Sequence, residues 1–280
     1  MSLGPSQAGG PPRLHLLALA RSLRQHRSLL LRLVRRDVAS RYQGSAAGLL
    51  WSLATPLLML AVYLFVFGYV FTPLRAPGAS TALPTFGLGL FAGMLTHALF
   101  ADCLIRAVHA IVSQPSYVKK IVFPVELLPL TVLGSALVQY AIGWGVLLAA
   151  TLAVLGLSPA VVLLPLVTLP LMLVCAGVAL GIAALSVYLR DIGQLTGLAS
   201  TVLMFLSPVF YPLDSLPDWL RRWMHLNPLT FPIEASRDLL LRGLTPDWAA
   251  WGVYGLASVG VLWLGWATFE ALRRGFADVL

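Results

Sequence analysis

An all-α protein that crosses a membrane several times is the fold class predicted by this sequence, and three observations lead to it. Of the 280 residues, 59% are hydrophobic and only 11% are charged, whereas a soluble domain carries roughly 25% charged residues. Long stretches lack Asp, Glu, Lys and Arg, and each exceeds the roughly 20 residues that a helix needs to cross a bilayer. The Lys and Arg residues are also unevenly distributed between the connections. A soluble enzyme, a disordered chain and a secreted disulfide scaffold are therefore excluded.

The uncharged stretches divide into six predicted spans. Residues 127–189 are too long for one span, because a helix rises about 1.5 Å per residue, and a Gly-Leu-Ser-Pro turn signal at 156–159 lies near their middle. Pro165 and Pro170 are compatible with a kink in the fourth span, since a neighbouring helix can satisfy the freed carbonyl groups. The predicted spans are residues 48–71, 82–105, 128–155, 160–188, 192–212 and 248–269.

The positive charges predict which side of the membrane each connection occupies. With six spans both termini share one side, and fourteen of the 19 Lys and Arg residues fall on that side. Because Lys and Arg resist translocation, we expect both termini to be cytoplasmic. The net charge of +8 therefore reflects membrane topology and does not indicate nucleic acid as a partner.

The N-terminal region is predicted to lie on the inner membrane surface. Residues 1–12 are rich in Gly and Pro and should form a flexible tail, and residues 13–45 should form an amphipathic interfacial helix. On a helical wheel its arginines occupy about half the circumference, and four apolar side chains lie opposite, a pattern typical of helices at anionic lipid surfaces. The arginines are Arg21, Arg24, Arg27, Arg32, Arg35 and Arg36, and the apolar residues are Leu23, Leu30, Leu33 and Val34. A soluble helix packed on a partner remains an alternative.

The connection between the fifth and sixth spans, about residues 213–247, is predicted to lie on the outer side. Its charges are mixed, and it contains two short apolar helical patterns separated by Asn227-Pro228. We expect two short re-entrant helices that enter the outer leaflet.

The sequence contains no catalytic or metal-binding pattern. It lacks a phosphate-binding G-x-x-x-x-G-K-[ST] loop, its five His are scattered, and Cys103 and Cys175 are predicted to be small core residues. Asp102, Arg106 and His109 share one helical stripe near the inner end of the second span. This stripe is either an internal Asp102–Arg106 pair or part of a polar pathway through the membrane.

Aromatic residues mark the outer half of the first span. Tyr63, Phe67 and Phe71 recur every four residues and are therefore stacked on one helical face, with Phe65 and Tyr69 opposite. The stacked face is a candidate wall for a glycan, because sugar rings pack their C–H faces on aromatic rings; an interfacial aromatic belt is the alternative. Small residues at Gly89 and Gly93, and at Gly177 and Gly181, would allow other helices to approach closely.

Five motifs in order resemble the membrane subunits of type-2 ABC exporters for O-antigen, capsule or teichoic-acid polymers. The resemblance covers about residues 30–270. The motifs are Arg36-Asp37 with the segment from Arg41 to Met59, the segment from Val118 to Leu130, the segment from Tyr188 to Ile192, the segment from Ser207 to Pro212, and Leu226-Asn227-Pro228-Leu229 with Arg237.

The resemblance implies a half-transporter. Two copies of the chain would form the conduit as a homodimer, and two separate ATPase subunits would bind ATP and magnesium on the cytoplasmic side. This chain would then be a transport subunit and not an enzyme, with no cofactor of its own, in a bacterial inner (cytoplasmic) membrane. Residues 46–280 would form the six-span domain, with a coupling segment at about 113–121. The coupling residues implied are Gln114, Pro115, Ser116, Tyr117, Val118, Lys119 and Lys120.

From this resemblance we expect a lipid-linked polysaccharide to enter near the inner leaflet, beside the basic interfacial helix. Arg36 and Arg41 are candidates for holding its lipid pyrophosphate. The glycan would then pass the aromatic residues of the first span and leave under an outer lid. The lid residues are Trp219, Trp223, Asn227 and Pro228.

Three other functions remain open at this stage. An ABC exporter permease for drugs or other lipids would share the six spans and the coupling segment. A secondary transporter driven by an ion gradient would usually contain inverted repeats and broken helices, which we do not find in the sequence. A structural membrane scaffold fits poorly with the polar stripe at Asp102.

Overall fold

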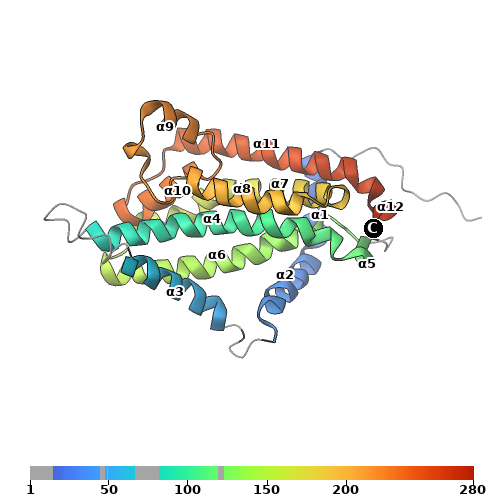
Figure 1. Cartoon of the computed structure of the whole chain (residues 1–280), viewed down its shortest axis with the longest axis horizontal. Helices are drawn as coiled ribbons and strands as arrows, with labels where there is room; N and C mark the ends of the chain where they lie inside the picture. Colours follow the sequence, from blue (N-terminus) through green and yellow to red (C-terminus); the bar gives the residue numbers. More distant parts are fainter. Residues whose placement is uncertain (1–14, 45–47, 49, 67–81, 119–122) are drawn as a thin grey trace, which may run out of the picture.

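The computed structural model describes residues 15–44, 48, 50–66, 82–118 and 123–280. Within these ranges every regular element is a helix (Figure 1), as the hydropathy pattern predicts. The flexible tail proposed for residues 1–12 lies outside the described residues.

Four described helices are long and apolar enough to cross a membrane. They are α4 (Ala82–Val112), α6 (Leu127–Val154), α7 (Leu164–Tyr188), which follows the 3-10 helix η3 (Pro159–Leu163), and α11 (Trp248–Leu272). The turn at residues 156–159 separates α6 from η3 and α7, as predicted. At the start of α11 the Asp247 carboxylate accepts hydrogen bonds from the amides of Ala249 and Ala250, a typical helix N-cap.

The two other predicted spans correspond to shorter apolar helices, α3 (Leu50–Phe65) and α8 (Ile192–Leu206). The described residues therefore do not confirm the count of six. Residues 67–71 of the first predicted span lie outside the description. The helix α8 ends six residues earlier than predicted, because Ser207 has extended backbone angles of −97° and 152°, and a residue before proline disfavours the helical conformation.

The N-terminal segment forms two helices instead of one, α1 (Leu16–Gln25) and α2 (Arg27–Tyr42). His26 interrupts them with φ −104° and ψ 19°. The wheel for a continuous helix could not detect this break, because His26 is neither Gly nor Pro.

The long helices place two groups of short elements at opposite ends of the molecule (Figure 1). The inner end, named for the predicted orientation, holds α5 (Pro115–Val118) and α12 (Phe276–Val279), which follows the 3-10 helix η6 (Arg273–Gly275). The outer end holds α9 (Asp218–Met224) and α10 (Thr230–Arg237). The 3-10 helix η4 (Leu213–Ser215) precedes α9, and the π-helix η5 (Asp238–Arg242) follows α10.

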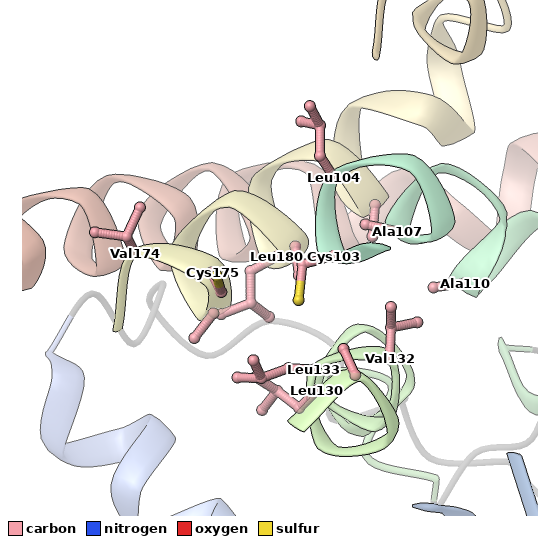
Figure 2. Packing of buried hydrophobic residues seen from close by; sticks show 14 of the residues in the cluster. Cys103, Leu104, Ala107, Ala110, Leu130, Val132, Leu133, Val174, Cys175 and Leu180 are labelled. Carbon is pink, nitrogen blue, oxygen red and sulfur yellow. The ribbon is translucent and has the colours of Figure 1, made fainter. Parts of the chain in front are cut away.

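The core lies between α4, α6 and α7. Cys103 of α4 and Cys175 of α7 are fully buried in it and carry free thiols, which confirms their assignment as core residues. Figure 2 shows both sulfur atoms in this layer, above Leu130 and Leu133 of α6.

The helices α7 and α11 approach each other at glycines. A Cβ atom on Gly265 would lie 2.0 Å from the carbonyl oxygen of Gly177, and a Cβ on Gly177 would lie 2.5 Å from that of Val261. Any side chain at either position would separate the backbones. The predicted role of Gly177 in close helix packing is confirmed, and its partner helix is α11.

Candidate functional site

The predicted coupling segment forms a short helix at the inner end that is tied to α2. Gln114 precedes α5, which consists of Pro115, Ser116, Tyr117 and Val118, whereas Lys119 and Lys120 lie outside the described residues. The Nη1 atom of Arg36 donates a hydrogen bond of 2.8 Å to the Tyr117 hydroxyl. The Arg36 guanidinium also lies 5.7 Å from the Tyr117 ring centroid, within cation–π range. The helices α5 and α2 are therefore in contact through this pair of side chains.

Glu126, which directly precedes α6, connects this part of the chain to α1 and to the end of α11. Its side chain is only 6% exposed. The hydroxyl of Ser22 in α1 donates a 2.6 Å hydrogen bond to one carboxylate oxygen, and Arg273 lies 3.5 Å from the other. Because a buried carboxylate is costly without partners, these contacts fix Glu126 in place and connect α1, α6 and the C-terminal end of α11.

Four charged residues form a continuous ion-pair network between α2 and α4. The Arg41 Nη2 atom lies 2.5 Å from the Asp102 carboxylate, and the Arg106 Nη2 atom lies 2.5 Å from that of Asp37. Arg106 also contacts Asp102 at 3.3 Å, which confirms the pairing predicted for these two residues. Ser135 of α6 accepts hydrogen bonds from both arginines, at 3.2 and 2.9 Å. The network is thus electrically balanced and joins three helices.

This network separates two cavities. A cleft of about 490 Å³ lies on one side, between α2, α4 and the start of α6, and Asp37 and Arg106 belong to its wall. A cavity of about 520 Å³ lies on the other side, beneath α3, and Arg41 and Asp102 belong to its wall. The ion pairs thus form part of the partition between them, so Asp102 also lines a cavity, as the polar-pathway interpretation requires.

The cavity beneath α3 is mainly apolar. Tyr63 of α3 lines it together with Phe91 of α4, and their ring centroids are 6.2 Å apart. Phe65, on the opposite face of α3, is 60% exposed. Tyr63 therefore faces inward as the wheel predicts, whereas Phe67 and Phe71 lie outside the described residues.

At the outer end, Arg237 of α10 is surrounded by backbone oxygen atoms. Its Nε donates to the Gly89 carbonyl at 2.9 Å, its Nη1 donates to the Pro208 carbonyl at 2.5 Å, and its Nη2 donates to that of Val209. Glu234, one turn earlier in α10, lies 3.1 Å from Nη1. Burial raises the pKa of the Glu234 carboxyl, and the charge of Arg237 opposes this shift.

The small residues of α4 make room for this arginine. A Cβ atom on Gly93 would lie 3.1 Å from Nη2 of Arg237, and one on Gly89 would lie 2.9 Å from Leu241. The predicted close approach at this glycine pair is therefore confirmed, and the element that approaches is the outer segment rather than another long helix.

The other predicted lid residues take two roles in the structure. The side-chain amide of Asn227 donates to Leu206 O and Ser207 Oγ, both at 3.0 Å, and the carbonyl of Pro228 accepts a 2.8 Å bond from Tyr254. Trp219 and Trp223 of α9 are instead 66% and 68% exposed. Asn227-Pro228 thus fixes the break between α9 and α10, and the two indoles are available to lipid or to another chain.

Sequence reasoning did not find Glu126 as a junction, the pairing of Arg41 with Asp102, or the carbonyl contacts of Arg237. Each depends on partners far away in the sequence. The available signals were a carboxylate in an apolar stretch for Glu126 and the small residues opposite Arg237. No group of His, Cys, Asp and Glu suited to a metal ion occurs in the described ranges.

The comparisons with known proteins agree with this architecture. Residues 28–241 match the family model described as ABC-2 type transporter. The chain is 28% identical over 267 residues to the O-antigen export system permease protein RfbA of Myxococcus xanthus, which covers 94% of this chain and 99% of that protein. A protein of the same name from Klebsiella pneumoniae is 24% identical over 255 residues, covering 90% and 95% respectively. Because the family match spans most of its length, this multi-pass membrane protein belongs to the ABC-2 type transporter family.

Proposed function

We propose that the chain is the transmembrane subunit of an ATP-driven exporter that moves a lipid-linked polysaccharide across the bacterial cytoplasmic membrane. It works as a homodimer with two separate ATPase subunits, and both of its termini are cytoplasmic. The observation that carries the proposal is the similarity to O-antigen export permeases over nearly the full length of both chains. ATP and magnesium act on the ATPase subunits, and this chain needs no cofactor.

The inner end supports a route for the movement. Closure of the ATPase dimer displaces the coupling segment, here Gln114 to Val118 together with Lys119 and Lys120. The displacement reaches α2 through the Arg36–Tyr117 contact and reaches α1 through Glu126. The ion pairs between α2 and α4 then exchange partners. A contact with two alternative pairings allows a ligand or a partner protein to shift the population between two conformations of the chain.

The outer end supports a lid. The glycan passes the aromatic residues of the first span and leaves beneath α9 and α10, which re-enter the outer leaflet. The exposed Trp219 and Trp223 suit the interface between lipid headgroups and acyl chains, where indole rings concentrate. The contacts of Arg237 keep α10 against α4 during this passage.

An ABC exporter permease for drugs or other lipids is the second candidate. The mainly apolar cavity of about 520 Å³ beneath α3 favours it, because drug-sized ligands occupy cavities of roughly 300–1,000 Å³. An assay that offers both a lipid-linked glycan and a hydrophobic drug distinguishes export of polysaccharide from export of drugs.

The test is to reconstitute the chain with its ATPase in liposomes and to measure ATP-dependent transfer of a lipid-linked glycan. Export should require both subunits and ATP and should stop when the phosphate-loop Lys of the ATPase is replaced. Transfer of a hydrophobic drug but not of the glycan would favour the second candidate. Transfer of either cargo without an ATPase would refute both.

A further inference from the structure

The cleft between α2, α4 and the start of α6 has an unusual set of polar groups for an apolar chain. Three charged residues line it, Arg36, Asp37 and Arg106, and they carry a net charge of one positive unit. Its other polar lining residues are Ser40, Gln43, His109, Ser113, Gln114 and Thr131. Hydroxyl, amide and imidazole groups on one concave surface can bind a ligand that is itself rich in oxygen.

The cleft retains donors for an anion. A guanidinium has five N–H donors, and the contact of Arg36 with Tyr117 uses one of them. Asp37, the carboxylate of this wall, is bound to Arg106, so its charge is compensated locally. Arg36 therefore provides the positive charge in the wall that no carboxylate among the described residues pairs with. Arginine binds phosphate oxygens in a bidentate manner.

Gln114, which belongs to the wall of the cleft, also carries an acceptor that lacks a donor. The Oε1 atom of Gln114 is buried and has no hydrogen-bond partner among the described residues. An unsatisfied buried acceptor costs roughly 1–3 kcal/mol, so a ligand with a hydroxyl group would gain by binding there. A phosphate ester attached to a sugar offers both the anion for Arg36 and the hydroxyl for Gln114.

We propose that this cleft binds the glycosyl phosphate headgroup of the exported lipid. The inference rests on the proposed function and deepens it, because it places the headgroup on α2 and next to the coupling segment. Arg36 holds a phosphate oxygen, and Gln114 accepts a hydrogen bond from a hydroxyl of the first sugar. Arg41, the other candidate from the sequence, lies beyond the partition against Asp102 and does not touch the headgroup.

The position of Gln114 connects the proposed headgroup site to the coupling segment. Gln114 directly precedes α5, and Arg36 contacts Tyr117 within α5. Both ligand-binding side chains therefore connect to the coupling segment, so headgroup binding and ATPase docking act on the same few residues.

The test measures headgroup binding in the intact complex with its ATPase, without nucleotide, in phosphatidylcholine nanodiscs. The probes are farnesyl-pyrophosphoryl-glucose and farnesyl pyrophosphate, and phosphatidylglycerol is the competitor. Arg36→Gln should weaken binding of both probes about tenfold, since a hydrogen bond to a charged group is lost. Gln114→Leu should weaken the glucose probe more than the sugarless probe, because only the glucose probe brings a sugar hydroxyl that loses its acceptor.

Two further variants control for folding and for general electrostatics. Arg35→Gln makes the same charge change on the neighbouring residue of α2, which is exposed and does not line the cleft, and should leave affinity within about twofold. Ser113→Trp, at the exposed position directly after α4, should block the cleft while the melting temperature stays unchanged.

The outcomes separate this proposal from the proposed function. Equal effects of Arg35→Gln and Arg36→Gln, or displacement of the probe by phosphatidylglycerol at equal concentration, would overturn the cleft as a specific headgroup site. Wild-type export of glycan combined with unaltered binding in the Arg36 and Gln114 variants would refute the cleft and leave the exporter intact. Absence of export by the wild-type complex would refute the exporter, whatever the cleft binds.

Discussion

Arginine is used in two different ways at the two ends of this molecule. At the inner end Arg41 and Arg106 face carboxylates on other helices, and their side chains are 23% and 28% exposed. At the outer end Arg237 is 16% exposed and faces mostly backbone carbonyl groups. A carboxylate can exchange one arginine for another as helices shift, whereas three carbonyls with fixed positions form a rigid socket.

The comparison indicates where the chain can change shape. The inner network has two acids and two bases within reach of one another, so more than one pairing satisfies all four charges. The socket of Arg237 has a single arrangement, because its oxygens belong to α4 and to the turn after α8. We therefore expect movement at the inner end and a stable attachment at the outer end.

The largest expected effect follows from removing the outer arginine. Arg237→Ala leaves buried carbonyl groups and the Glu234 carboxylate without their donor, and the loss of one partner of a buried pair costs about 3–5 kcal/mol. The melting temperature of the purified chain, followed by tryptophan fluorescence, should fall by several degrees. Arg242→Ala is the matched control, since that arginine is 58% exposed; an equal fall in both variants would contradict the socket.

An intermediate effect is expected for the inner network. Asp102→Asn removes the charge partner of Arg41 while Asp37 remains 3.9 Å away, so the loss of stability should be about 1–2 kcal/mol, between the exposed and buried limits. Exchanging the charges, with Arg41→Asp and Asp102→Arg in one chain, should restore part of it. Chemical unfolding of the single and double variants measures the coupling. Additive losses would show that these two side chains do not interact.

The smallest effect on stability is expected at the predicted coupling segment. Tyr117→Phe removes one hydrogen bond at the surface, worth less than about 1 kcal/mol, and keeps the ring contact with Phe123 at 4.6 Å. The amount of glycan exported per ATP hydrolysed should nevertheless fall by about half or more, because α5 loses its hydrogen bond to α2. Tyr211→Phe, which removes a hydroxyl bonded to Phe205 at the outer end, is the control. An unchanged ratio in Tyr117→Phe would remove the role of Arg36 in coupling.

The long helices and the family could be predicted from the sequence, because both depend on patterns of residues that are close together in the chain. Uncharged stretches located α4, α6, α7 and α11, and the order of the motifs indicated the family that the match of residues 28–241 confirms. The Asp102–Arg106 pair was also accessible, since residues four positions apart share a helical face.

Long-range partners were not accessible in this way. Arg41 was expected to face lipid pyrophosphate, yet 61 positions separate it from the carboxylate that it contacts. The contact between Arg237 and Gly89 spans 148 positions. A helical wheel shows which residues share a face, but it cannot show which helix that face meets, and a single sequence offers no other source for that information.

The glycine contact between α7 and α11 has a consequence for biogenesis. Gly177 is synthesised long before Gly265. The backbone of α7 at Gly177 therefore has no contact with α11 until α11 has been made. The fully buried rings of Trp266 and Phe269 belong to the same late helix. The packing between these two helices is therefore completed only after α11 has been synthesised.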